Sequence, residues 1–452
     1  MESTVNLMGN VSSGDAPNLQ RVPFDDAPTT SFHVLVAVAA AGGQFSDGYI
    51  LGTIGIALSL SRETLHLNAT WMGLLGGASL AGLFAGSLLL GPLADRFGRR
   101  PLLIPTMAAF TVISMLQFFV TSPWQLLVLR LLLGLALGVD YVVCCTVVAE
   151  FAPMRTRARL LSLLVLVWTL GYTTAFIVGT LLSSEAQNAW RWILLSSAAP
   201  SAVVFVLRLF IPETPAWLVQ HGNAGKAREI VTRHIGSSVD LPVVRSSDTR
   251  SLLASWRELL GPKYRRRAVV GAVMYTAQVI PYFALGTFIP AVFEALGIRS
   301  NYLSGAIFNV FMLLGTAFGL WLIDKITRRQ FIISAFYISA VTLLALVLVN
   351  AGAVYTVTLS AFFAFVLAAS TNLDFAYLPE LFPTRLRAVG VGFGTAASRV
   401  GSAFSTFMLP LCMEALGIRV ALGLCVGVLL VGGVVCHAFA PETQGQPIEV
   451  EL

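Results

Sequence analysis

Apolar residues fall into twelve long runs separated by short polar connections. Each run approaches the ~20 residues that one helix needs to cross the hydrocarbon core of a bilayer. The runs cover residues 32–60, 71–90, 101–120, 125–149, 159–183, 191–211, 268–293, 303–323, 330–350, 354–378, 389–413 and 419–440. The pattern predicts an all-α integral membrane protein with twelve transmembrane helices.

The polar segments divide the chain into five parts. Residues 1–31 are polar and predict a disordered N-terminal tail, and residues 441–452 form a C-terminal tail. The long polar linker 212–267 separates a first half, 32–211, from a second half, 268–440. Within the linker, residues 224–235, with Asn223 as the cap, and residues 252–260 have the pattern of short interfacial helices, with Trp256 facing the bilayer. A flexible tether is the alternative interpretation.

Composition and charge support the membrane assignment. Only 12% of residues are charged and 56% are hydrophobic, whereas soluble domains carry about a quarter charged residues. Lys and Arg concentrate in alternate connections, with ten in 226–267 alone. By the positive-inside bias, these connections and both termini are expected in the cytoplasm. Orientation explains the net charge of +6, so nucleic acid is not expected as a partner.

Three elements of the first half recur in the second half at one offset. Asp95 and Arg99-Arg100 return 229 residues later, Glu150-x-x-Pro-x-Arg-x-Arg returns after 230, and Pro-Glu213-Thr returns after 229. Such a repeat predicts two parallel six-helix halves related by an axis normal to the membrane, with the substrate site between them.

The same elements carry a resemblance to a known family. Gly91, Asp95 and Gly98-Arg99-Arg100 resemble the loop between helices 2 and 3 of the major facilitator superfamily of secondary transporters. The stretch 379–385 and the two Pro-Glu-Thr elements are similar to its sugar porter branch and that branch's organic-acid relatives. The resemblance implies alternating access, with charged residues that pair across the halves to close the cytoplasmic side. A role in topology alone is the alternative for these residues, which are Gly91, Asp95, Arg99, Arg100, Glu150, Arg155, Glu213, Asp324, Arg328, Arg329, Glu380, Arg385 and Glu442.

A few charged residues lie within the apolar runs. A charge in hydrocarbon costs at least ~2.5 kcal/mol, so each such residue is a functional candidate. Asp47 and Arg130 have compatible depths on neighbouring spans. A buried Asp beside an Arg can exchange a proton when the Arg moves away, because burial favours the neutral carboxyl and the cation favours the carboxylate. Asp47 and Arg130 are therefore predicted to couple transport to protons, with a static ion pair as the alternative, and Asp140 is a second proton candidate.

Polar and aromatic stripes on the spans predict the substrate site. Arg399 is the strongest candidate, because a guanidinium can hold a carboxylate through two hydrogen bonds; a structural pair with Asp374 is the alternative. The sugar porter pattern of two adjacent Gln is reduced here to Gln278, which favours a small organic anion over a hexose. The predicted substrate-binding residues are Gln44, Tyr49, Trp168, Tyr172, Tyr275, Gln278, Tyr282, Asn309, Asn372, Asp374 and Arg399.

Together these features predict a proton-coupled symporter for a sugar acid, an aromatic carboxylate or nicotinate, in a bacterial inner membrane. No cofactor, metal or enzymatic activity is expected, because no phosphate loop, ligand cluster or nucleophile–base arrangement is found. The five cysteines lie inside apolar runs and are interpreted as small core residues. The expected partners are an anionic small molecule, protons and lipid, with the protein as a monomer. A sugar–proton symporter, a proton-driven exporter of amphiphilic compounds and a non-transporting sensor are the alternatives.

Overall fold

The computed structural model describes residues 22–90, 93–183, 188–243, 252–298, 301–349, 352–383 and 386–443. Two of the predicted gate residues, Gly91 and Arg385, lie outside these ranges. Within them the chain is almost entirely helical, and an isolated bridge between Val22 and Val239 is the one strand-like pairing.

The predicted twelve-helix architecture is confirmed. In the first half the spans are α1 (Ser31–Ser61), α2 (Ala69–Ala85) with its π-helical continuation η2 (Gly86–Leu90), α4 (Arg100–Leu116) with η3 (Gln117–Phe119), α5 (Pro123–Phe151), α6 (Met154–Leu182), and α7 (Ala189–Ser196) followed by α8 (Ala198–Arg208). In the second half they are α12 (Arg265–Ala295), α13 (Asn301–Leu322), α14 (Arg328–Leu348), α15 (Ala353–Ser370) followed by α16 (Leu373–Glu380), α17 (Arg387–Leu416) and α18 (Ile418–Phe439).

Ten of the described spans are long and apolar enough to cross a membrane by length and composition alone. The other two have physical reasons to fall short. Helix α4 contains 17 residues and reaches full length only with η3. Helix α17 is long enough, but it buries a polar face that includes Ser398, Arg399, Ser402 and Thr406. A polar inner face of this kind is expected where a helix lines a functional site.

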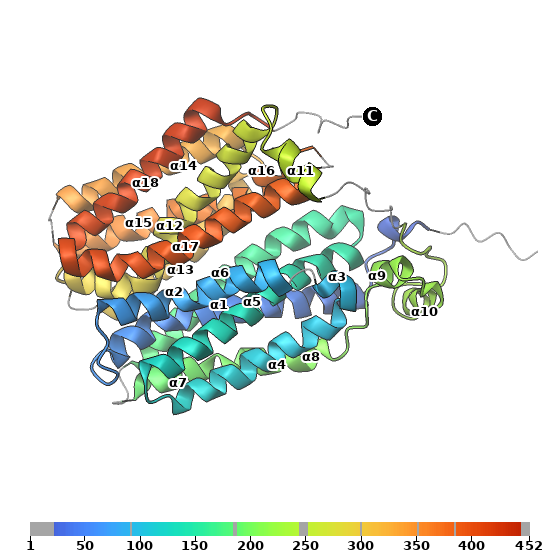
Figure 1. Ribbon diagram of the computed structural model, residues 1–452, viewed down its shortest axis with the longest axis horizontal. Helices are drawn as coiled ribbons and strands as arrows, with labels where there is room; N and C mark the ends of the chain where they lie inside the picture. The colour runs from blue at the N-terminus through green and yellow to red at the C-terminus, as the bar shows by residue number, and fades with distance from the viewer. Residues whose placement is uncertain are drawn as a thin grey trace, which may run out of the picture.

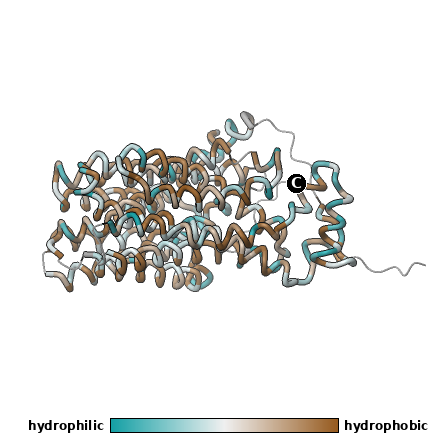
Figure 2. The backbone as a smooth tube through the Cα atoms, turned by 90° about the horizontal axis from the view of Figure 1, so that it is seen from below, coloured by the Kyte–Doolittle hydropathy of each residue, from teal (hydrophilic) through white to brown (hydrophobic). Residues whose placement is uncertain are grey.

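The two halves form separate bundles that lean together at one end and diverge toward the other (Figure 1). The linker helices α9 (Pro215–Gln220), α10 (Ala224–His234) and α11 (Leu252–Leu259) lie at the diverging end, which we call the linker end. We call the opposite end the far end. Across the halves, α2 packs on α17, α6 on α13 and α1 on α12. Apolar residues follow the length of the bundles, and hydrophilic residues gather in the linker (Figure 2).

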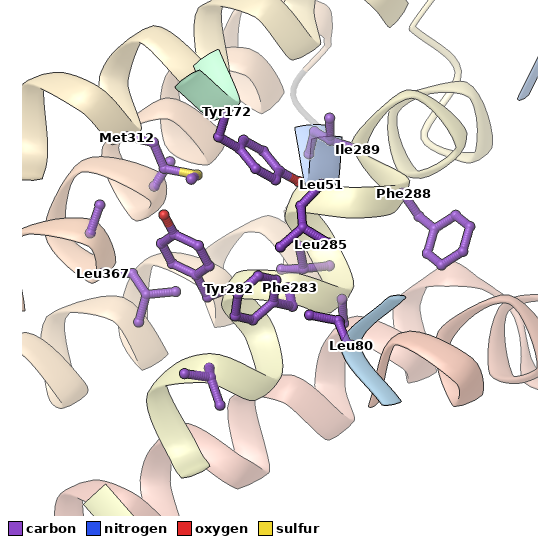
Figure 3. Close-up of a cluster of buried hydrophobic side chains, with 14 of the residues drawn as sticks. Leu51, Leu80, Tyr172, Tyr282, Phe283, Leu285, Phe288, Ile289, Met312 and Leu367 are labelled. Carbon is purple, nitrogen blue, oxygen red and sulfur yellow. The ribbon is translucent and has the colours of Figure 1, made fainter. Parts of the chain in front are cut away.

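Glycines and aromatic rings bring the halves together at the far end. A Cβ atom added at Gly55 of α1 would lie 1.9 Å from the carbonyl oxygen of Thr287 in α12, and one at Gly73 of α2 would lie 2.3 Å from that of Phe407 in α17. Only glycine permits such an approach between backbones. Figure 3 shows Tyr172 of the first half beside Tyr282 and other apolar side chains of the second half. The far end is therefore closed in this structure.

The N-terminal segment and the linker differ in part from expectation. Residues of the predicted disordered tail are ordered, because Val22 pairs with the linker through bonds to Ser238 and Asp240, each 2.9 Å long. The ring of Phe32 also packs on His234 of α10, with centroids 4.4 Å apart. Both linker helices form close to the predicted bounds. Trp256 packs edge-on against the ring of Phe393 in α17, because α11 lies against α17, and 38% of Trp256 stays exposed, so its predicted contact with the bilayer surface remains a prediction.

Candidate functional site

Arg130 reaches α1 but does not contact Asp47. Both of its terminal nitrogens lie 3.3 Å from the backbone carbonyl of Ile50, three residues beyond Asp47. The predicted depth of Arg130 along α1 was therefore correct to within one helical turn, but its predicted contact with the Asp47 side chain is not formed. A carbonyl can satisfy a buried guanidinium only in part, and Nε of Arg130 has no hydrogen-bond partner. The alternative of a static Asp47–Arg130 ion pair is wrong for this structure.

Asp140 instead forms a fully buried ion pair with Arg208 of α8. The second Asp140 oxygen lies 3.0 Å from Nη2 of Arg208. Thr106 of α4 donates a hydrogen bond of 3.0 Å to Asp140, and the Cys144 thiol donates one of 3.2 Å. The carbonyl of Leu103 accepts a further bond from Arg208. We call Asp140, Arg208, Thr106 and Cys144 the charge cluster. Sequence reasoning did not single out Arg208 or Thr106.

Asp47 lies near the charge cluster but has no such partners. Its side chain is buried, and its Oδ1 atom accepts no hydrogen bond. The charges that act on it are Asp140, Arg208 and Arg399. Because a buried carboxylate normally has hydrogen-bond partners, Asp47 is the carboxyl group in this region with the least support for a negative charge.

Arg399 of α17 lies where the two halves meet. Its guanidinium sits 5.1 Å from the ring centroid of Tyr141 in α5 of the other half, a residue that sequence reasoning missed because it follows Asp140 in an apolar run. Tyr275 and Asp374 lie within electrostatic reach of Arg399. No carboxylate forms an ion pair with it among the described residues, and its Nε has no partner. The alternative of a structural Arg399–Asp374 pair is therefore not observed.

Aromatic side chains from both halves lie between Arg399 and the far end. The indole of Trp168 stacks on the ring of Tyr172 with centroids 5.6 Å apart, and it approaches Tyr282 at 6.3 Å and Phe283 at 6.0 Å. The first two rings belong to α6 and the last two to α12. The structure thus brings together three of the predicted aromatic residues, Trp168, Tyr172 and Tyr282.

Three buried amides in the second half keep a free carbonyl oxygen. Gln278 donates to the Ser370 hydroxyl at 2.9 Å, Asn309 to the Gly305 carbonyl at 2.8 Å, and Asn372 to the Thr316 carbonyl at 3.0 Å. The oxygen of each amide has no protein partner. Asn372 lies in the break between α15 and α16, and interrupted spans are typical of transporter binding sites. We call these amides with Tyr141, Tyr275, Asp374 and Arg399 the central polar cluster.

Two predicted substrate residues of α1 have different surroundings. Tyr49 points away from the second half, since its hydroxyl lies 3.0 Å from the hydroxyl of Ser196 in α7. Gln44 is buried with an unpartnered Nε2 atom, and it lies one helical turn before Asp47. Tyr49 is therefore separate from the central polar cluster.

The repeated charged elements form one clasp in each half at the linker end. In the first half, Glu213 accepts hydrogen bonds from the backbone amides of Arg99 and Arg100 at 3.0 and 3.1 Å. Arg99 also pairs with Asp95 at 3.0 Å and with Glu150 at 2.8 Å. Negative charge at these amides is favourable because they form the N-terminus of α4.

The second half repeats the same clasp. Glu442 accepts from the backbone amide of Arg329 at 3.2 Å, and Arg328 lies 3.7 Å from Glu380. Within the described part of the chain, the ion pairs of Arg99 and Arg328 join residues of the same half, and the closed end of the molecule is the opposite one. The predicted pairing across the halves therefore remains a prediction. Within the described ranges, no three His, Cys, Asp or Glu side chains gather closely enough to hold a metal ion.

The chain resembles known proteins along nearly its whole length. The family model described as sugar (and other) transporter matches residues 35–451. The inner membrane metabolite transport protein YgcS of Escherichia coli strain K12 is 37% identical over 431 residues, covering 95% of this chain and 96% of YgcS. The niacin transporter NiaP of Acinetobacter baylyi is 24% identical over 433 residues, covering 94% and 98%.

The fold also resembles solved structures of the xylose transporter XylE from E. coli. Its partially occluded inward-open conformation has a TM-score of 0.78 at 18% identity, covering 92% of this chain and 100% of that chain. XylE described as a proton:xylose symporter and bound to 6-bromo-6-deoxy-D-glucose has a TM-score of 0.70 at 18% identity, covering 92% and 98%.

Proposed function

The chain belongs to the sugar (and other) transporter family, and we propose that it is a proton-coupled symporter of a small organic anion. It is a multi-pass membrane protein that transports a small molecule and is not an enzyme. The substrate class and the coupling ion are the parts that we infer. A sugar acid, an aromatic carboxylate and nicotinate are the candidate substrates, and the niacin transporter NiaP shows that the relatives include a transporter named for a carboxylic acid.

One observation carries the proposal: among the described residues Arg399 forms no ion pair with a carboxylate, although Asp374 and Asp47 lie within reach of its charge. A substrate carboxylate bound to Arg399 would neutralise that charge. Asp47 would then lose part of the support for its own negative charge and would take up a proton. Binding of the anion and of the proton would favour each other, as symport requires.

The orientation follows from the loop charges. The linker end holds the clasps and most of the basic connections, so we place it and both termini in the cytoplasm, in a bacterial inner membrane. The halves then meet on the side away from the cytoplasm and diverge toward the cytoplasm. In the opposite state, the clasp residues of the two halves would approach one another.

The test is uptake of labelled hexoses, sugar acids, aromatic carboxylates and nicotinate into proteoliposomes, with and without an imposed pH gradient. We expect gradient-driven uptake of a carboxylate. Asp47→Asn should abolish the response to the gradient while binding is retained, and Arg399→Ala should abolish binding. Tyr49→Phe is the matched control, because Tyr49 lies in the same helix but contacts α7. Carboxylate uptake that ignores the gradient would contradict the proton coupling.

A sugar–proton symporter is the second candidate, and a specific observation favours it. The free oxygens of Gln278, Asn309 and Asn372 could accept hydrogen bonds from sugar hydroxyls, and the stacked Trp168 and Tyr172 offer an apolar wall. Uptake of a neutral sugar that is unaffected by Arg399→Ala would establish this reading in place of the first. Uptake of an anion that is lost with the guanidinium would exclude it.

A further inference from the structure

Two buried carboxyl groups lie near each other in the first half, with very different surroundings. Asp140 has the guanidinium of Arg208, a hydroxyl donor and a thiol donor. Asp47 has an oxygen without any donor. When two carboxyl groups in one site have such different environments, one favours the charged form and the other the neutral form. The two groups can then take different roles in proton transfer.

Helix α1 connects the two carboxyl groups physically. A Cβ atom at Gly43 would lie 1.9 Å from Nη2 of Arg208 and 2.8 Å from Oδ2 of Asp140. The backbone of α1 thus rests directly on the ion pair, and a larger residue at position 43 would have to displace the charged groups. Asp47 follows Gly43 by one helical turn on the same face. The position of Asp47 relative to Asp140 is therefore set by the contact of α1 with the ion pair.

We propose that Arg208 is a positioning residue that decides which of the two carboxyl groups carries the proton. Arg208 holds Asp140 as the carboxylate throughout the cycle, and it thereby leaves Asp47 as the group that binds a proton and releases it to water. Asp140 neither gains nor loses a proton. The inference rests on the proposed function for the role of Asp47, and it removes Asp140 from the candidate proton carriers.

The neighbouring titratable groups are consistent with this division. Besides each other, the two carboxyls face Cys144 and Cys145 from α5, Arg208 from α8 and Arg399 from α17. Of the two cations, Arg208 contacts Asp140 directly, whereas neither cation forms an ion pair with Asp47. The negative charge that Arg208 preserves on Asp140 disfavours a second negative charge on Asp47.

The test measures protonation directly and needs no substrate. The purified full-length protein is reconstituted in lipid, and its infrared spectrum is followed while the pH is lowered from alkaline to neutral. A protonated carboxyl group gives a C=O stretching band that a carboxylate lacks. Every sample carries Asp374→Asn, because Asp374 is a further buried carboxyl group with an unpartnered oxygen and would add its own band. In this background we compare the otherwise wild-type protein, called the wild type below, with Asp47→Asn, Arg208→Gln, Arg208→Lys and the double variant Asp140→Asn/Arg208→Gln, in which both members of the buried pair are neutral.

We expect the wild-type band to disappear in Asp47→Asn and to remain in the double variant. In Arg208→Gln, Asp140 loses its cation and also binds a proton, so the band should grow about twofold. Arg208→Lys should restore the wild-type spectrum. A role of Arg208 in stability alone would lower the yield of folded protein and leave the band per molecule unchanged.

Three results would overturn the inference: a band that survives Asp47→Asn, a band that is lost in the double variant, or an Arg208→Gln spectrum with no added band. If Arg208→Gln does not fold, the spectra of Asp47→Asn and of the double variant still test the inference. Uptake without gradient dependence, together with the expected bands, would refute the proposed function and leave this assignment in place.

Discussion

Replacing Gly55 by alanine should open the far end of the transporter. The added Cβ atom would lie 1.9 Å from the carbonyl oxygen of Thr287 and 3.0 Å from its carbonyl carbon. Cβ atoms in proteins do not approach other atoms closer than 3.0 Å, so α1 and α12 must separate by about 1 Å. Both contacts are to backbone, and no side chain can move aside to relieve them.

The expected size of the effect follows from that overlap. Forcing one methyl group into a packed contact costs about 1–3 kcal/mol, which corresponds to a roughly 5–150-fold change in the ratio of two states. Alanine also favours a helix over glycine by about 1 kcal/mol, but α1 is helical in both states, so this term cancels. The clash exists only when the far end is closed, and it therefore shifts the population toward the open far end.

Spin-label distances measure this shift. In a variant without the five native cysteines, labels at Glu63 and Glu414, both exposed at the far end on opposite halves, should give a short distance. Gly55→Ala should add a longer one. Gly427→Ala in α18 is the matched control, because a Cβ atom there meets nothing within 4 Å. Identical distance distributions for the two variants would refute the argument from backbone contact.

Three further outcomes are expected. Glu213→Gln removes the negative charge that accepts from the first amides of α4 and should lower stability by about 1 kcal/mol, measured by thermal unfolding in detergent; an unchanged midpoint would contradict the clasp. Burial and the neighbouring Arg233 lower the pKa of His234, so docking of α10 should be complete above about pH 6.5 and weaken as the pH falls. Hydrogen exchange over 224–234, expressed as protection relative to the intrinsic exchange rate at each pH, measures this, and lower protection at alkaline pH would contradict it. Trp168→Ala removes the indole that contacts rings of both halves. Substrate affinity, measured by equilibrium binding, should fall about tenfold or more, equivalent to ~1.4 kcal/mol. Unchanged affinity would mean that the substrate binds elsewhere.

The spans and the repeat were predictable because they depend on local properties of the chain. Bilayer thickness sets the length of each apolar run, and the predicted bounds lie within a few residues of the observed helices. Even α17, which buries a polar face, was predicted, because its apolar residues form a run, 389–413, long enough to span a bilayer. The linker helices followed from their amphipathic pattern in the same way.

The partners of the buried charges could not be predicted, because they depend on how each helix is rotated. The position of Arg130 along its span correctly predicted that it lies beside α1. The rotation of the helices about their axes, however, points its side chain at the Ile50 carbonyl. Arg208 lies near the end of the predicted run 191–211 and was not singled out among the charges within the spans. The apolar stretch 209–211 that follows it was the available signal that it lies inside the span. Its pairing with Asp140, 68 residues away in sequence, requires the tertiary packing that brings both α5 and α8 against α1 and α4.

The two clasps have a mechanical consequence. In the first half, Glu213 follows the sixth span and bonds the start of α4. In the second half, Glu442 follows α18 and bonds the start of α14. None of these bonds needs to break when the halves rotate against each other, so each half moves as a rigid body while the glycine contacts of the far end separate. A displacement of one half around Arg399 is then transmitted without bending to the clasp of that half at the linker end.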